Sequence, residues 1–162
     1  MGDAAGITKA EYNAARDRAA AEYKTMRGRC DELSGNGKDV CVAEAKAFEA
    51  KRKAEAEASY RNSEKAVRNA RLAAVDADYS VAKARCDART GNEKSVCVAE
   101  ATAARRKAKA DAEAAAKMNE VRRDVAEEKS DADYKVALEK CNLLGGAAKD
   151  SCVSDAKARY SR

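Results

Sequence analysis

Six cysteines are the residues of this chain whose type and spacing could do chemistry. They form three pairs with the same spacing, 11 positions: Cys30 and Cys41, Cys86 and Cys97, and Cys141 and Cys152. An even number of regularly spaced cysteines is typical of disulfides formed in an oxidising compartment. A zinc site needs four ligands, and the chain has no His to add to a pair of cysteines. Redox chemistry is not favoured either, because no Cys-x-x-Cys motif is present. The spacing therefore predicts three structural disulfides, with a cytosolic thiolate metal carrier as an alternative.

No other set of residues points to a reaction. The chain has no His, so a Ser-His-Asp constellation is excluded, and it has no phosphate-binding or dinucleotide-binding motif. Its 28 Asp and Glu residues are spread so evenly that no carboxylate pair stands out as a general acid and base. We therefore predict a protein that is not an enzyme and binds no cofactor.

The cysteine pairs belong to an internal repeat, because they recur at nearly equal intervals and their neighbours recur with them. A tyrosine lies seven residues before the first cysteine of each pair, and a glycine lies five residues after it. These residues are Tyr23, Tyr79 and Tyr134, and Gly35, Gly91 and Gly146. The repetition predicts a single elongated domain of three repeats, at about 7–62, 63–118 and 119–162, after a flexible N-terminus at 1–6.

The composition predicts an all-α fold. The chain has 162 residues, of which 40 are Ala and only 18 are Leu, Ile, Val or Phe, so a conventional apolar core is not expected. Ala, Glu, Lys and Arg favour long helices, and glycine midway between paired cysteines marks a turn between two helices. We therefore expect elongated antiparallel helical hairpins in a coiled-coil-like bundle, with three turns stapled by disulfides.

The lengths of the central helices are left open. The stretches from about 38 to 88 and from about 93 to 142 contain no Gly or Pro, and they predict two helices of roughly 50 residues. Shorter helices, near 7–33 and 148–160, would pack beside them at one end. The alternative is a break near Asn62 and Ser63, where Ser63 could cap a new helix, and another near Asn119.

Two surfaces are candidates for binding. The net charge of +5 and the basic run Arg105, Arg106, Lys107 and Lys109 suggest contact with a polyanion. The competing interpretation is a solvated helical face, because many Glu residues precede a Lys or Arg by four positions. An apolar patch that includes Tyr60, Val67, Leu72, Val121 or Val125 would instead favour the binding of unfolded proteins. The repeated tyrosines could stack on a ligand, but their place on the helices favours core or rim positions.

Targeting signals are missing from the sequence. Met1 to Gly6 has neither a basic nor an apolar region, so we expect a signal peptide to have been removed, and no apolar run is long enough to span a membrane.

Three segments, Cys30–Lys46 (CDELSGNGKDVCVAEAK), Cys86–Ala101 and Cys141–Lys157 (CNLLGGAAKDSCVSDAK), resemble those of Ala/Lys-rich, Cys-repeat periplasmic proteins of beta-proteobacteria, labelled TolA-like or cell-envelope proteins. The resemblance begins at about Gly6, covers nearly the whole chain and implies an exported, periplasmic protein. No functional residue is carried over from the family, because the matching positions are those that build the hairpins.

These observations together predict a non-catalytic structural or interaction protein of the bacterial cell envelope. The expected partner is a protein or an envelope component, and a homo-oligomer is left open. The alternatives are a cationic periplasmic stress or chaperone-like protein, or a polyanion-binding protein, and then the thiolate metal carrier.

Overall fold

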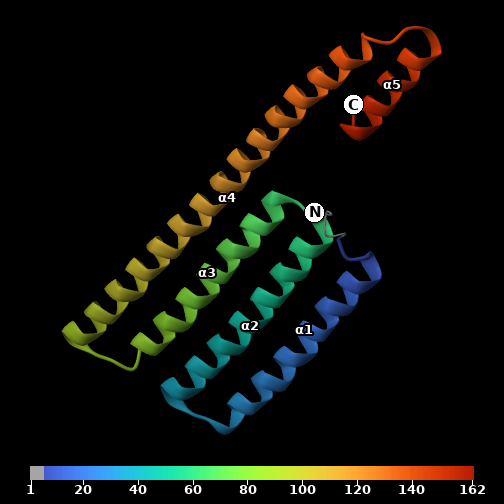
Figure 1. Ribbon diagram of the computed structural model, residues 1–162. Coiled ribbons are helices and arrows are strands. Elements are labelled where there is room, and N and C mark those ends of the chain that lie inside the picture. The colour runs from blue at the N-terminus through green and yellow to red at the C-terminus, as the bar shows by residue number, and fades with distance from the viewer. Residues whose placement is uncertain (1–5) are drawn as a thin grey trace. The chain divides into compact units, whose positions relative to one another are not determined.

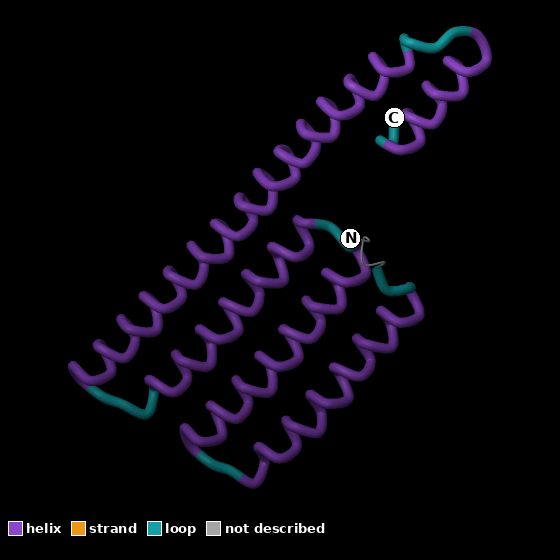
Figure 2. The backbone as a smooth tube through the Cα atoms, in the orientation of Figure 1, coloured by secondary structure: helices purple, strands orange, loops and turns teal. Residues whose placement is uncertain are grey.

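The computed structural model describes residues 6–162, and all of its regular structure is helical. In chain order the helices are α1 (Lys9–Arg29), α2 (Gly35–Arg61), α3 (Glu64–Cys86), α4 (Gly91–Cys141) and α5 (Gly146–Arg159), and a short 3₁₀ turn covers Cys30–Glu32. Figure 2 shows that short loops join these helices. The predicted all-α fold with three disulfide-stapled turns is confirmed. Gly6 apart, the predicted flexible N-terminus lies outside the described residues.

Glycine opens the helix that follows each of the three stapled turns. Gly35, Gly91 and Gly146 have φ angles of +59°, +57° and +57°. Residues with a Cβ atom rarely adopt this left-handed conformation, whereas glycine does so without steric cost. The three turns therefore share the same glycine backbone conformation, as the repeat predicts.

The break expected near Asn62 is present, and the one expected near Asn119 is not. Asn62 ends α2 in the left-handed conformation, with a φ of 47°, and the Ser63 hydroxyl accepts a hydrogen bond of 3.1 Å from the Ala66 N–H at the start of α3. When the first two repeats are aligned on their cysteines, Asn62 falls on Met118, which has no comparable tolerance of positive φ. The 51-residue helix α4 therefore passes through Asn119 without a break. The prediction of one unbroken helix is wrong for 38–88 and holds for 93–142.

The chain divides into two compact units, of which the first ends at Ala116 and the second is Lys117–Arg162. In the first unit α1 packs against α2 and α2 packs against α3. Figure 1 shows these three helices and the beginning of α4 side by side in one layer. The boundary lies close to the predicted junction of the second and third repeats.

The helices of the first unit meet through small residues. Ala19, Ala45, Ala56 and Ala66 are buried, and Val81 is the largest apolar side chain buried there. Alanine contributes about one methyl group each, so its burial is worth on the order of 1 kcal/mol or less. The second unit has an even smaller buried core, since Cys141 and Ala156 are its only buried residues. Covalent bridges must therefore supply a large share of the stability.

Candidate functional site

The three cysteine pairs are joined as predicted, and none of the six thiols is free. The Cα atoms of the bridged residues are 5.6 Å apart at Cys30–Cys41, 5.5 Å at Cys86–Cys97 and 5.6 Å at Cys141–Cys152. These separations are typical of disulfides. The first cysteine of each pair is at most 1% exposed. The bridges are therefore internal staples, and their sulfur atoms are not available as thiolate ligands.

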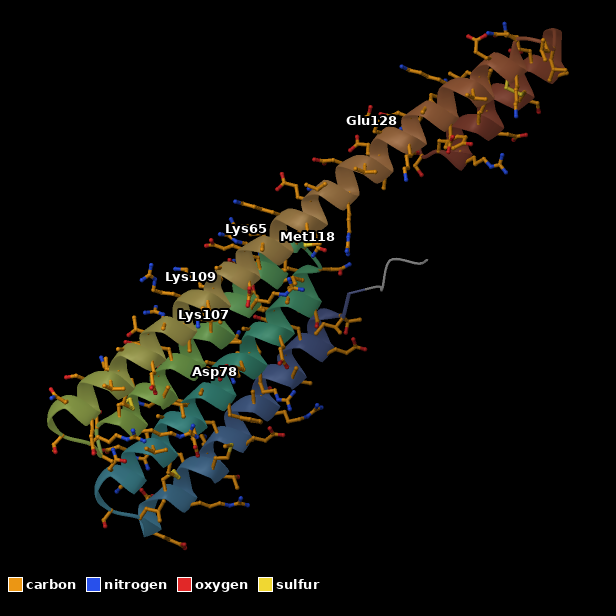
Figure 3. The ribbon with its side chains drawn as sticks, turned by 60° about the vertical axis from the view of Figure 1, so that its left-hand side comes forward. Lys65, Asp78, Lys107, Lys109, Met118 and Glu128 are labelled. Atoms are coloured by element: carbon orange, nitrogen blue, oxygen red, sulfur yellow. A yellow bond between two sulfur atoms is a disulfide. The ribbon has the colours of Figure 1, made fainter. Side chains whose placement is uncertain are left out.

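The basic run does not form one surface. Successive helical residues turn by about 100°, which places Lys107 on a different side of α4 from Arg105. The Arg105 guanidinium forms an ion pair of 2.8 Å with Asp76 and lies 4.8 Å from the centre of the Tyr79 ring. Arg105 thus fastens α4 to α3. Within residues 6–162, Arg106, Lys107 and Lys109 are exposed and form no ion pair; Figure 3 labels the two lysines.

The repeated tyrosines are half-buried in all three repeats. Tyr79 packs beneath Arg105, as described above. The ring of Tyr134 lies 5.9 Å from that of Tyr160 and 5.7 Å from the Arg162 guanidinium, in the second unit. These contacts join neighbouring helices, so the tyrosines occupy the rim positions that their spacing favoured.

A cluster of polar and aromatic side chains, which the sequence analysis missed, fastens the start of α1 to the end of α2. The rings of Tyr12 and Tyr60 stack with their centres 4.7 Å apart. The Tyr12 hydroxyl donates a hydrogen bond of 2.5 Å to Glu57, which also pairs with Arg61. The hydrogen bond from Arg61, and then that from Tyr12, lowers the pKa of Glu57, while the bond to Glu57 raises the pKa of Tyr12.

The sequence analysis named Tyr60 as part of an exposed apolar patch, but its ring stacks on Tyr12 and so helps to hold α1 against α2. Tyr60 is nevertheless 38% exposed. Leu72 is half-buried, whereas Val67 is 37% exposed. Val121 and Val125, at 59% and 47%, are more exposed than either and belong to the second unit. The five residues are therefore divided between the two units.

Other apolar residues are as exposed as those that the sequence suggested. Met118 and Val136 are 55% and 54% exposed on α4, and Leu143 is 86% exposed in the last turn. Alignment of the last two repeats on their cysteines pairs Val136 with Val81, which is only 9% exposed, so Val136 can be recognised by combining the repeat with the exposures. A residue that is buried in one repeat and exposed in another marks a surface that lacks its partner.

The groove between α2 and α3 does not resemble a small-molecule binding site. The groove between α2 and α3 has a volume of about 660 Å³, and half of the residues that line it are alanines. Small-molecule sites combine apolar walls with a few convergent polar groups. In the described part of the chain, no cluster of three or more Cys, Asp or Glu is arranged to hold a metal ion. Nor is any described helix both long enough and apolar enough to cross a membrane.

Comparisons of the chain with protein-family models, with curated proteins and with solved structures found no match. The surfaces described above are therefore the basis for a functional conclusion.

Proposed function

We propose that this protein is a non-catalytic structural or interaction protein of the bacterial cell envelope. The observation that carries the proposal is the set of three disulfides in a chain whose buried residues are nearly all alanine or cysteine. Disulfides persist in extracytoplasmic compartments and are reduced in the cytosol. A scaffold that depends on them suits the periplasm, and exposed apolar residues on α4 supply a surface for a partner.

Cell fractionation tests the location. In the cells that produce the protein, we expect osmotic shock to release it with periplasmic markers, already oxidised on a non-reducing gel. A protein that remains with cytosolic markers and has free thiols would contradict the proposal and would favour the thiolate metal carrier.

The binding of unfolded proteins is a second candidate, and the exposure of Val121 and Val125 favours it. If α4 holds unfolded clients, the protein should suppress the aggregation of a heat-denatured enzyme, and Val121→Ser/Val125→Ser should remove this effect. Leu33→Ser is a matched control, because Leu33 is 48% exposed and lies outside α4. Equal activity of the two variants would argue against α4 as the client surface.

Polyanion binding is the remaining candidate. Within the basic run, Arg106, Lys107 and Lys109 are available for it, since Arg105 is engaged by Asp76 and Tyr79. Arg106→Glu/Lys109→Glu should lower the salt concentration needed to elute the protein from heparin, because each lost contact reduces the salt dependence of binding. Unchanged elution would contradict this candidate.

A further inference from the structure

The first unit is a single layer of helices, whose two outer edges are formed by α1 and by α4 as far as Ala116 (Figure 1). Inside the layer a helix has a neighbour on each of two opposite sides, as α2 has α1 and α3. A helix at an edge has a neighbour on one side only. The repeat shows what fits the other side, because aligning the first two repeats on their cysteines places α1 on α3, and α2 on the first half of α4.

The contact between α2 and α3 is therefore the comparison for both edges. Ala43 and Ala47 of α2 pack with Ala77 and Val81 of α3, and the two helices run antiparallel (Figure 1). Three polar contacts join the same helices: Lys51 with Asp78, Glu44 with Arg85 at 2.8 Å, and the Asn36 side chain, which donates a hydrogen bond of 2.8 Å to the Ala84 carbonyl. The interface thus combines small apolar residues with complementary polar groups.

The outer side of α4 repeats the side of α2 that faces α3. Six residues of this side are identical in type in the two helices, and on α2 they are Asn36, Val40, Ala43, Ala47, Ala54 and Ala58. Their counterparts, which we call the α4 edge, are Asn92, Val96, Ala99, Ala103, Ala110 and Ala114. Intervals of three, four and seven place them on one side of the helix. All six are buried or half-buried on α2, whereas all six are exposed on α4.

The outer side of α1 repeats the side of α3 that faces α2. Five small residues form what we call the α1 edge: Ala10, Ala14, Ala21, Thr25 and Gly28. Their counterparts on α3 are Ala66, Ala70, Ala77, Val81 and Ala84. These counterparts are buried or half-buried, whereas the residues of the α1 edge are all exposed. The two edges of the unit are therefore copies of the two surfaces that pack together at its centre.

One unit cannot bring its own edges together, because α2 and α3 lie between them. A second copy removes this obstacle. We propose that copies of this chain associate head to tail, with the α4 edge of one copy packed antiparallel against the α1 edge of the next, as α2 packs against α3. Each copy then continues the layer of its neighbour. Because the contact joins two different surfaces, each assembly keeps a free edge at either end and grows into chains or closes into rings.

Both ion pairs of the α2–α3 contact recur between the edges. Their counterparts are Lys107 of α4 with Glu22 of α1, and Glu100 of α4 with Arg29 of α1. The sign of the charge is the same as in the comparison at all four positions. Within residues 6–162, none of these four side chains has an ion-pair partner. The neighbouring copy supplies a partner of opposite charge for each, which favours this pairing over others.

Two departures from the α2–α3 contact also match each other. Ala50 of α2 and Ala73 of α3 line the same groove. Their counterparts are Arg106 on α4 and Asp17 on α1, and both are exposed. Where the centre of the unit has two small residues, the edges thus have opposite charges. Complementarity between the edges is therefore kept even where the residues differ.

The contact is short, so the association should be weak. From Asn92 to Ala114 the α4 edge extends for about 33 Å at 1.5 Å per residue. About four of every seven residues face the partner in a helix pair, which gives roughly 13 residues from each copy. Specific interfaces of standard size use roughly 20–30 residues per side. We therefore expect assembly that depends on protein concentration.

Sedimentation velocity tests the proposal on the purified, oxidised protein. We expect the average mass to rise above the chain mass of 17.3 kDa between about 10 µM and about 1 mM protein. Ala103→Lys and Ala21→Lys should each raise the dissociation constant at least about 10-fold, because each buries an unpaired charge in one edge. Ala104→Lys is the matched control, since Ala104 is exposed but turned by about 100° from Ala103. A wild type that stays monomeric throughout, or an edge variant that associates like the wild type, would overturn the proposal.

Mixing the two edge variants tests which surfaces meet. Ala103→Lys keeps an intact α1 edge, and Ala21→Lys keeps an intact α4 edge. An equimolar mixture should therefore form one-to-one dimers and nothing larger, at concentrations where each variant alone is monomeric. A mixture that stays monomeric would overturn the head-to-tail contact. These measurements do not depend on cellular location, so they can fail while the proposed envelope function stands, and the reverse also holds.

Discussion

Removal of the last disulfide, by Cys141→Ala/Cys152→Ala, should unfold α5 while the first unit stays folded. The second unit buries only Cys141 and Ala156, and the methyl group of Ala156 is worth about 0.8 kcal/mol. Closing a loop of about 12 residues contributes roughly 3 kcal/mol in the chain-entropy model. A helix of 14 residues is marginal on its own. The bridge is therefore the largest stabilising contribution to this hairpin.

Hydrogen exchange measured by mass spectrometry is the appropriate assay, because it resolves each helix. A loss of about 3 kcal/mol corresponds to roughly 100-fold faster exchange throughout α5. The matched control is Cys86→Ala/Cys97→Ala, which removes the same loop in the first unit. There the ion pairs Arg105–Asp76 and Arg68–Glu113 still join α3 to α4, so protection should fall without complete loss. If the amides of α5 exchanged as slowly in Cys141→Ala/Cys152→Ala as in the wild type, the reasoning would be refuted.

Three further changes should have local effects. Asn62→Ala should lower the free energy of unfolding by about 1 kcal/mol, because alanine disfavours a φ of 47°, whereas Asn62→Gly should be tolerated; urea denaturation compares them. Tyr12→Phe should raise the pKa of Glu57 towards its ordinary value of 4.5, which a pH titration by NMR would detect. Because the folded pKa of Glu57 is lowered, its contribution to stability is present at neutral pH and is lost as the pH falls through that pKa; the variant should lose part of this dependence. Arg105→Ala should cost about 1 kcal/mol through the loss of a partly exposed ion pair and a cation–π contact, and Lys109→Ala should cost almost nothing; thermal unfolding distinguishes the two.

Local spacing explains why the stapled turns could be predicted from the sequence. A disulfide between residues such as Cys30 and Cys41, around a glycine that allows positive φ, depends on few distant contacts. The composition likewise predicted helices, because alanine and the long charged residues favour them irrespective of packing. Coiled-coil packing and the envelope location stay predictions.

The two asparagines show where sequence reasoning was insufficient. Asn62 and Asn119 both interrupt stretches without glycine, yet only Asn62 ends a helix. Two differences in the sequence explain this: Met118 stands where the first repeat has Asn62, and Ser63 caps α3, whereas Glu120 after Asn119 is a good helix former. The contact between Tyr12 and Tyr60 depends on where α2 ends, and so the sequence alone could not predict it.

The exposed apolar residues of α4 were only partly predictable from the sequence. Val121 and Val125 stand out as apolar residues in a charged helix, and the sequence analysis selected both. Val136 could be recognised only by comparing its exposure with that of Val81, its counterpart in the second repeat. Met118 aligns with Asn62, so its exposure is known only from the structure. Arg105 was selected for its charge, but the structure shows that Asp76 and Tyr79 engage it.

The intact mass of the protein, purified without reductant from the cells that produce it, tests the central claim most directly. We predict a mass six hydrogens below that of the reduced chain, with no thiol that alkylates before reduction, because all three pairs are bridged. Six thiols that alkylate at once would contradict the claim that disulfide-stapled hairpins hold this fold together.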